Sequence, residues 1–115
     1  MKLVKSNQLS EVGVSHDPSI KKKVIIGDNE IPQLKMFSTV TFRTGQFVER
    51  HRHASMYEVF YIQQGKAEFC VNEVTFTVEE GDCITIEQGE FHSMSNPFQE
   101  EVTWLYFGIA TDEAL

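Results

Sequence analysis

The chain has 115 residues, of which 41% are apolar and 23% are charged, and its net charge is −7. This length suits one domain that is large enough to bury its own core, and the composition excludes a disordered chain. Because 17 acidic side chains outnumber 10 basic ones, the protein would repel a phosphate backbone, and we expect no nucleic-acid partner.

No apolar run approaches the roughly 20 residues that a transmembrane helix requires. The first residues, MKLVKSNQLSEVG, lack the apolar region of a secretory signal. We therefore expect a cytoplasmic protein without a membrane partner. Its two cysteines, Cys70 and Cys83, are too few for a disulfide framework, and we expect both to be reduced.

The first part of the chain is polar and of mixed composition. We expect residues 1–33 to form an arm that packs over the edge of the main body, with a short edge strand at residues 24–26. The one basic cluster, residues 21–23, indicates solvated surface, as short charge runs usually do. His16 is likewise expected to be a surface residue of the arm.

From residue 34 onward the pattern is one strand after another. β-Branched and aromatic residues are concentrated in short runs that end at glycine-containing turns, which is typical of strands. The predicted strands cover residues 36–42, 58–63, 66–71, 74–78, 83–86, 91–94 and 102–110. Many short strands without sustained helical periodicity predict a sandwich or barrel over residues 34–115.

Residues 66–78 predict a β-hairpin with a two-residue loop at Asn72 and Glu73. In this register Val71 pairs with Val74, and Phe69 pairs with Phe76. One face of the hairpin then carries only apolar side chains, and we expect this face to cover the core. Its members are Ala67, Phe69, Val71, Val74, Phe76 and Val78.

The last predicted strand, VTWLYFGIA at residues 102–110, is apolar on both faces. A strand of this kind in a small antiparallel protein indicates a further layer above it, for which a second subunit is one candidate. We therefore expect a homodimer.

The stretch HRHASMYE at residues 51–58 contains two of the four histidines of the chain. On a strand, side chains at positions i and i+2 point to the same side, so His51 and His53 project together. Two imidazoles held in this way can bind one metal ion. Glu58 lies an odd number of residues after His53, so residues 54–57 must bend or bulge to bring its carboxylate to the same place.

Two longer motifs surround this stretch. The first, TGQFVERHRHASMYEVFYIQQG, runs from Thr44 to Gly65, and the second, GDCITIEQGEFHSMSN, runs from Gly81 to Asn96. Together they resemble the two-part signature of the cupin superfamily, and they cover nearly half of the chain. The second motif departs once, since Glu87 stands where the family usually has proline. Residues 86–89 can still form a type I turn with glycine at its fourth position.

The resemblance implies a single-domain, cupin-type jelly-roll barrel, a double-stranded β-helix that holds a divalent metal ion. Carried over to this sequence, the metal ligands would be His51, His53, Glu58 and His92. Three imidazoles and one carboxylate suit Fe, Mn, Ni, Co or Zn, and in an octahedral shell they leave two positions open. Because imidazoles bind metal only when neutral, metal occupancy is expected to fall below about pH 6.

The complete ligand set favours a metalloenzyme of the oxygenase, isomerase or lyase type that acts on a small organic molecule. One alternative is a non-enzymatic barrel that binds or senses a small ligand such as a sugar, because a fold alone does not determine its chemistry. Another is a domain whose metal only stabilises the fold. The catalytic residues are unknown at this stage, and we expect Arg43, Phe60 and Tyr106 to contact the substrate.

An apolar lining is expected around the metal, although the sequence alone does not indicate which side chains point inward. The candidates are Phe42, Phe47, Phe60, Phe69, Phe91, Met94, Trp104 and Tyr106.

Overall fold

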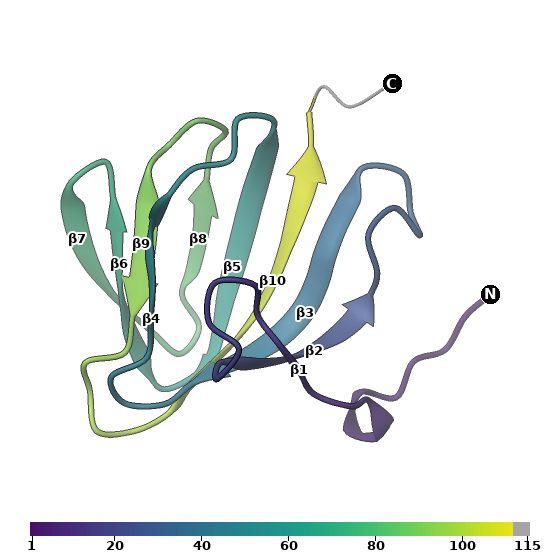
Figure 1. Cartoon of the computed structure of the whole chain (residues 1–115), viewed down its shortest axis with the longest axis horizontal. Coiled ribbons are helices and arrows are strands. Elements are labelled where there is room, and N and C mark those ends of the chain that lie inside the picture. The colour runs from purple at the N-terminus through teal and green to yellow at the C-terminus, as the bar shows by residue number, and fades with distance from the viewer. Residues whose placement is uncertain (112–115) are drawn as a thin grey trace.

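The computed structural model describes residues 1–111 of the chain. This part contains ten β-strands in two antiparallel sheets (Figure 1). The strands are β1 (Val12–Gly13), β2 (Lys21–Ile26), β3 (Leu34–Phe42), β4 (Phe47–His51), β5 (Met56–Gln64), β6 (Lys66–Val71), β7 (Val74–Glu79), β8 (Cys83–Ile86), β9 (His92–Ser95) and β10 (Val102–Ala110). A three-residue 3₁₀ turn, η1 (Ser6–Gln8), precedes them. It is the only helical segment of residues 1–111, so this part of the chain has no helix that could cross a bilayer.

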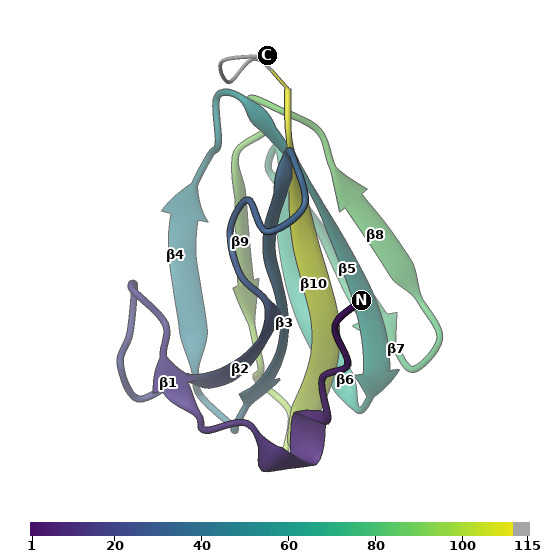
Figure 2. The ribbon, with the colours of Figure 1, turned by 90° about the vertical axis from the view of Figure 1, so that its right-hand side faces the viewer.

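The strands form two sheets that face each other. The larger sheet has the order β1-β2-β3-β10-β5-β8, and the smaller sheet has the order β4-β9-β6-β7. Figures 1 and 2 show the smaller sheet on one side of the molecule and the strands of the larger sheet curving around the other side. The predicted all-β jelly-roll barrel is thus confirmed.

The core lies between the two sheets and is built from the inward positions of alternating strands. Phe60 and Ile62 of β5, for example, are buried, whereas the residues between and beside them face outward. Trp104 of β10 lies at the centre, with ring centroids 4.6 Å from Phe42 and 5.4 Å from Phe69. Burial of each such side chain stabilises the fold by about 1.5 to 3 kcal/mol relative to an exposed position.

The β6–β7 hairpin has the predicted register, with Val71 opposite Val74 and Phe69 opposite Phe76. Asn72 and Glu73 both have positive φ (47° and 71°), as a two-residue hairpin loop requires. The expectation that the whole apolar face covers the core is only partly correct, because Val74 and Phe76 are 54% and 47% exposed. Both belong to β7, which is the last strand of its sheet in the part of the chain that the structure describes.

The N-terminal region contributes more to the large sheet than the sequence predicted. The expected edge strand at residues 24–26 extends over Lys21–Ile26 and lies between β1 and β3. Ile20, immediately before it, is completely buried in the core. The division into an arm of residues 1–33 and a barrel of residues 34–115 stays a prediction, and residues 112–115 of that barrel lie outside the described part of the chain.

The turn at Glu87 also differs in register from the expected type I turn over residues 86–89. The N–H of Glu90 donates a hydrogen bond to the carbonyl oxygen of Glu87 at 3.2 Å, so the turn spans residues 87–90. Gly89 is its third residue and has φ +82°. A positive φ at the third position belongs to a type II turn, which favours glycine there.

Candidate metal centre

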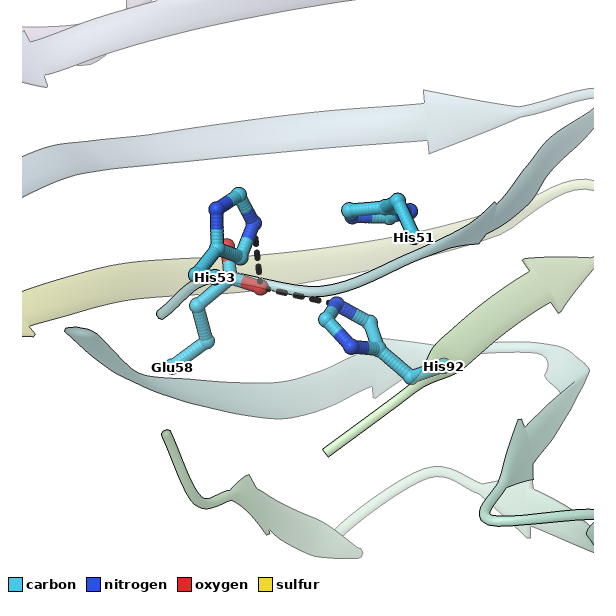
Figure 3. A group of neighbouring side chains, drawn as sticks. All are labelled: His51, His53, Glu58 and His92. Atoms are coloured by element: carbon cyan, nitrogen blue, oxygen red, sulfur yellow. Dashed lines mark hydrogen bonds and ion pairs between the residues drawn. The ribbon is translucent and has the colours of Figure 1, made fainter. Parts of the chain in front are cut away.

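Four side chains that the sequence singled out come together between strands of the two sheets (Figure 3). The group consists of His51, His53, Glu58 and His92, and one nitrogen or oxygen atom from each lies within 4.8 Å of all the others. A cation bonded to its ligands at about 2.1 Å holds opposite ligands about 4.2 Å apart. Small side-chain movements are therefore enough for these four residues to hold one metal ion.

The pairing of β4 with β9 brings the two motifs together. His51 ends β4 and lies directly opposite His92, the first residue of β9. His53 follows in the loop after β4, where its carbonyl oxygen accepts a hydrogen bond from the N–H of Gly89 at 2.8 Å. This bond ties the loop that carries His53 to the turn that precedes His92.

The expected bend between His53 and Glu58 is present. β4 ends at His51, residues 54 and 55 form a turn, and β5 begins at Met56. The chain thereby crosses from the smaller sheet to the larger one, and the Glu58 side chain points back toward the histidines. This reversal explains how an odd spacing places both side chains on the inside.

Backbone carbonyl groups orient two of the imidazoles. Nδ1 of His51 lies 2.7 Å from the carbonyl oxygen of Glu49, and Nδ1 of His92 lies 3.0 Å from that of Glu90. Each Nδ1–H therefore donates to a carbonyl oxygen, which leaves the Nε2 lone pair of a neutral ring free for a metal ion.

The Glu58 carboxylate lies between two imidazole nitrogens. Its Oε1 atom is 3.0 Å from Nε2 of His92 and 3.3 Å from Nε2 of His53 (Figure 3). A neutral His92 whose Nδ1 carries the proton would direct a lone pair at this oxygen, and two acceptors repel each other at that distance. Either a proton or a metal ion must therefore lie between them, so the donor set fits a divalent cation.

The electrostatics of the cluster reflect this pairing. Burial acts to raise the pKa of Glu58, but hydrogen bonds from His53 and His92 outweigh burial and lower that pKa to about 2. The hydrogen bond with Glu58 raises the pKa of His53 above its ordinary value, against the effect of burial. Burial lowers the pKa of His51, and the neighbouring His92 acts in the same direction.

A cavity of about 150 Å³ adjoins the cluster and is open on one side. His51, His53 and Glu58 form part of its wall, and much of the remainder is apolar. Among the aromatic and methionine candidates, the cavity is lined by Phe42, Phe60, Met94, Trp104 and Tyr106. Phe69 is buried elsewhere in the core, Phe47 is 54% exposed, and Phe91 lies beneath the guanidinium of Arg50.

The three residues expected to contact a substrate lie in different places. Phe60 and Tyr106 line the cavity and stack with ring centroids 5.7 Å apart. Burial raises the pKa of the Tyr106 hydroxyl to about 12, and the nearby Glu58 carboxylate acts in the same direction. Arg43 is exposed just beyond β3, outside the cavity wall.

Sequence reasoning missed the part of the cavity wall that comes from the N-terminal region, which includes His16 and Lys22. His16 is exposed, as expected, yet its ring lies 4.8 Å from that of His51 and it lines the cavity. Lys22 also lines the cavity and is half-buried, whereas the whole lysine cluster was interpreted as solvated surface. Successive side chains of a strand point to opposite faces. A strand predicted over residues 21–26 would therefore have placed Lys22 on the opposite face from Lys21 and Lys23.

Comparison with known proteins identifies a family. A model described as the cupin domain matches residues 38–108. A curated oxalate-binding protein of Thermotoga maritima is 27% identical over 71 residues, which are 62% of this chain. This chain spans 59% of the length of that relative.

Solved structures confirm the likeness in fold. A predicted oxalate decarboxylase from Thermotoga maritima superimposes with a TM-score of 0.87 at 20% identity, over 95% of this chain and 99% of the other. KdgF from a Halomonas species superimposes with a TM-score of 0.80 at 19% identity, over 100% and 99% of the two chains. At these identities, the similarity demonstrates a shared fold.

Proposed function

The chain belongs to the cupin domain family, and from that premise we propose that it is a metalloenzyme acting on a small organic acid at its three-histidine, one-glutamate centre. The observation that carries the proposal is the convergence of one nitrogen or oxygen atom from each of four side chains, all within 4.8 Å of one another, beside an open cavity. A divalent metal bound there would supply a Lewis acid that polarises a carboxylate or carbonyl oxygen. The metal ligands are His51, His53, Glu58 and His92 in this proposal.

The cavity supports a small and partly apolar ligand. A dry cavity of about 150 Å³ in another protein holds a benzene molecule, which has roughly six non-hydrogen atoms. The names of two similar proteins refer to oxalate, which favours an acid over a neutral sugar. A carboxylate would also complement a centre whose charge is about +1 when a divalent ion is bound by one carboxylate and neutral imidazoles.

The residues of the cavity have separate roles in the proposed reaction. Because its pKa is raised to about 12, Tyr106 keeps its proton at neutral pH and donates a hydrogen bond to a ligand oxygen. Phe60 stacks on Tyr106 and holds its ring in place. The apolar part of the wall lowers the local dielectric, which strengthens electrostatic interactions with the ligand. Oxygenase, isomerase and lyase reactions all fit this arrangement.

The assignment of the ligands is tested by metal content. We expect His53→Ala to lose most of the bound metal, because the remaining ligands no longer surround the ion. His16→Ala is the matched control and should retain it, since His16 is not one of the four ligands. Metal content measured by atomic emission after anaerobic purification distinguishes the two variants. Equal content in both would refute the ligand set.

The reaction is tested with the metal-loaded protein and a panel of small acids. Protein loaded separately with Fe(II), Mn(II), Ni(II), Co(II) or Zn(II) should bind and convert at least one acid, as followed by oxygen uptake, carbon dioxide release and NMR of the products. Binding that depends on metal, without turnover in any combination, would favour the second candidate, a binding barrel, which the name of the oxalate-binding relative supports. Binding of no acid in any metal form would refute both.

The location and the assembly of the protein remain predictions from the sequence. We propose a cytoplasmic homodimer with no nucleic-acid and no membrane partner.

A further inference from the structure

The loop between β1 and β2 closes part of the cavity. Val14, Ser15 and His16 of this loop line the cavity, and Figure 1 shows the loop (dark purple) lying across the space between the two sheets. The contact between the rings of His16 and His51, 4.8 Å apart, joins the loop to β4. A segment from the N-terminal region therefore forms part of the proposed site.

This loop is held by a defined set of hydrogen bonds. The N–H of Val14 donates to the carbonyl oxygen of Ile20 at 2.9 Å, and the N–H of Ile20 donates to that of Asp17 at 3.0 Å. One Asp17 carboxylate oxygen accepts from both the N–H and the hydroxyl of Ser19, at 2.9 and 2.7 Å. Because Ile20 is completely buried, the loop is anchored where β2 begins. Strand β2, which begins at the next residue, is thereby held in place beside the cavity.

Lys22 points into the barrel from β2. Its cross-strand partner is Val40, which is 3% exposed and belongs to the core, and residues directly opposite each other share one face of a sheet. Lys21 pairs with Thr41 and is exposed on the other face. Lys22 is therefore the one member of the lysine cluster at the cavity wall.

The ammonium group of Lys22 has no acidic partner within residues 1–111. The lysine is half-buried, and the apolar residues Val14, Met36 and Val40 line the same cavity. A lysine can lay its apolar stem along such a wall and keep its charge at the open side of the cavity. An unpaired cation at the wall of a small cavity favours an anion as its partner.

Lys22 and Glu58 face the cavity from different parts of the same sheet. Their strands, β2 and β5, are separated by β3 and β10, and three strand spacings of about 4.8 Å amount to roughly 14 Å along the sheet. A ligand that reaches from the metal centre to Lys22 must extend across the cavity between them. The two carboxylates of oxalate are joined by a single bond, whereas a longer dicarboxylate carries its second anionic group farther across the cavity toward Lys22.

Building on the proposed function, we propose that Lys22 is a specificity-determining residue that binds the second anionic group of a dicarboxylate whose first carboxylate lies at the metal centre. The preferred ligands are then dicarboxylates with at least one carbon between the carboxyl groups. A hydrogen bond to a charged group contributes about 1.5 to 3 kcal/mol, which corresponds to a preference of about tenfold or more over the monocarboxylate of equal length.

The test compares ligands in matched pairs. Calorimetry on protein loaded with Mn(II) or Co(II) gives the Kd for oxalate, malonate, succinate and glutarate, and for the monocarboxylates propionate, butyrate and valerate. We expect the wild type to bind at least one of the longer dicarboxylates about tenfold or more tightly than its matched monocarboxylate. Lys22→Met should lose this preference and keep its affinity for monocarboxylates. The control Lys21→Met should behave as the wild type.

The outcomes separate this inference from the proposed function. Binding of acids by the wild type with an unchanged preference in Lys22→Met would overturn the role of Lys22 and leave the proposed function intact. Binding of no acid by any metal-loaded wild-type protein would refute the proposed function itself. Loss of metal from both Lys22→Met and Lys22→Gln would also overturn the inference, because Lys22 would then support the centre and not the ligand.

Discussion

At the scale of single residues, Glu58 controls the electrostatics of the centre. It is 5% exposed, and a buried carboxylate without partners would have a raised pKa. The two imidazoles beside it reverse that effect and lower its pKa to about 2. Without a metal ion, the same pairing raises the pKa of His53, so a proton on this imidazole competes more strongly with a metal ion.

Competition between this proton and the metal makes metal binding dependent on pH. Imidazole binds metal only when neutral, and a free histidine has a pKa of about 6.5. Because the pKa of His53 is raised, occupancy should begin to fall above pH 6.5 as the pH is lowered and should be largely lost at about pH 5. Dialysis against limiting Zn(II) at several pH values, followed by metal analysis, measures this. Full occupancy at pH 5 would contradict the prediction.

The contribution of this pair to the stability of the metal-free protein should pass through a maximum as the pH changes. The lowered pKa of Glu58 contributes stability above its unfolded value of about 4.5, and this is lost as the pH falls toward about 2. The raised pKa of His53 contributes stability below about 6.5, and this is lost as the pH rises through the folded value.

The pair therefore stabilises the metal-free protein most between about pH 4.5 and 6.5. Thermal unfolding of chelated wild type and Glu58→Gln from pH 5 to 8 tests this. The advantage of the wild type in Tm should shrink at the alkaline end, and an advantage that grows there would contradict the assignment.

At the scale of elements, two close approaches of the backbone hold the centre and the strands around it. The bond from Gly89 to His53 joins the loop after β4 to the turn before β9. Gly65, between β5 and β6, has φ +82°, and a Cβ added there would lie 2.3 Å from the carbonyl oxygen of Glu101. Gly65 therefore allows the β5–β6 turn to pack against the chain just before β10.

A pair of glycine variants separates this contact from backbone strain. Gly81 has φ +90° but no atom within 4 Å of an added Cβ. Gly81→Ala should thus lower the free energy of unfolding only by the cost of placing alanine in the left-handed backbone conformation, about 1 to 2 kcal/mol. Gly65→Ala should lower it further, because the Glu101 backbone must also move. Urea unfolding measures both values, and equal losses would show that the close approach is unimportant.

At the scale of the whole molecule, the outer face of the larger sheet carries an apolar surface. Leu105, Phe107 and Ile109 of β10 lie beside Tyr61, Val59 and Tyr57 of β5, respectively. Tyr61 is 46% exposed, Tyr57 37% and Ile109 38%. β10 is apolar on both faces because its inward side chains fill the core and its outward side chains form this surface. A contiguous apolar surface of this kind is typical of an interface.

We predict that two copies of the chain associate through this surface. Tyr61→Arg should give a monomer, because it places charge at the centre of the interface. Phe76→Arg is the matched control, since Phe76 is 47% exposed on the smaller sheet. Sedimentation equilibrium of the wild type and both variants measures the mass. A wild-type monomer, or a dimer that survives Tyr61→Arg and is disrupted by Phe76→Arg, would contradict the prediction.

Features that depend on local spacing could be predicted from the sequence. β10 begins and ends at the predicted residues, and the β6–β7 hairpin has the predicted register, because a two-residue period and turn-forming residues are encoded locally. The group of three histidines and Glu58 followed from the resemblance of two motifs to the cupin signature. The turn that returns Glu58 toward His53 followed from their odd separation.

Features that depend on contacts between distant segments required the tertiary structure. Whether Phe42, Phe69 or Phe47 lines the cavity is decided by where the two sheets face each other, and each of these residues is equally apolar in sequence. His16 and Lys22 join the cavity only because β2 pairs with β3 and the preceding loop reaches β4. Arg43 lies outside the cavity wall because β3 ends before it. The sequence thus determined most of the strands and, through motifs that resemble the cupin signature, the four residues of the cluster, whereas the packing of the arm against the barrel decided which groups surround the ligand.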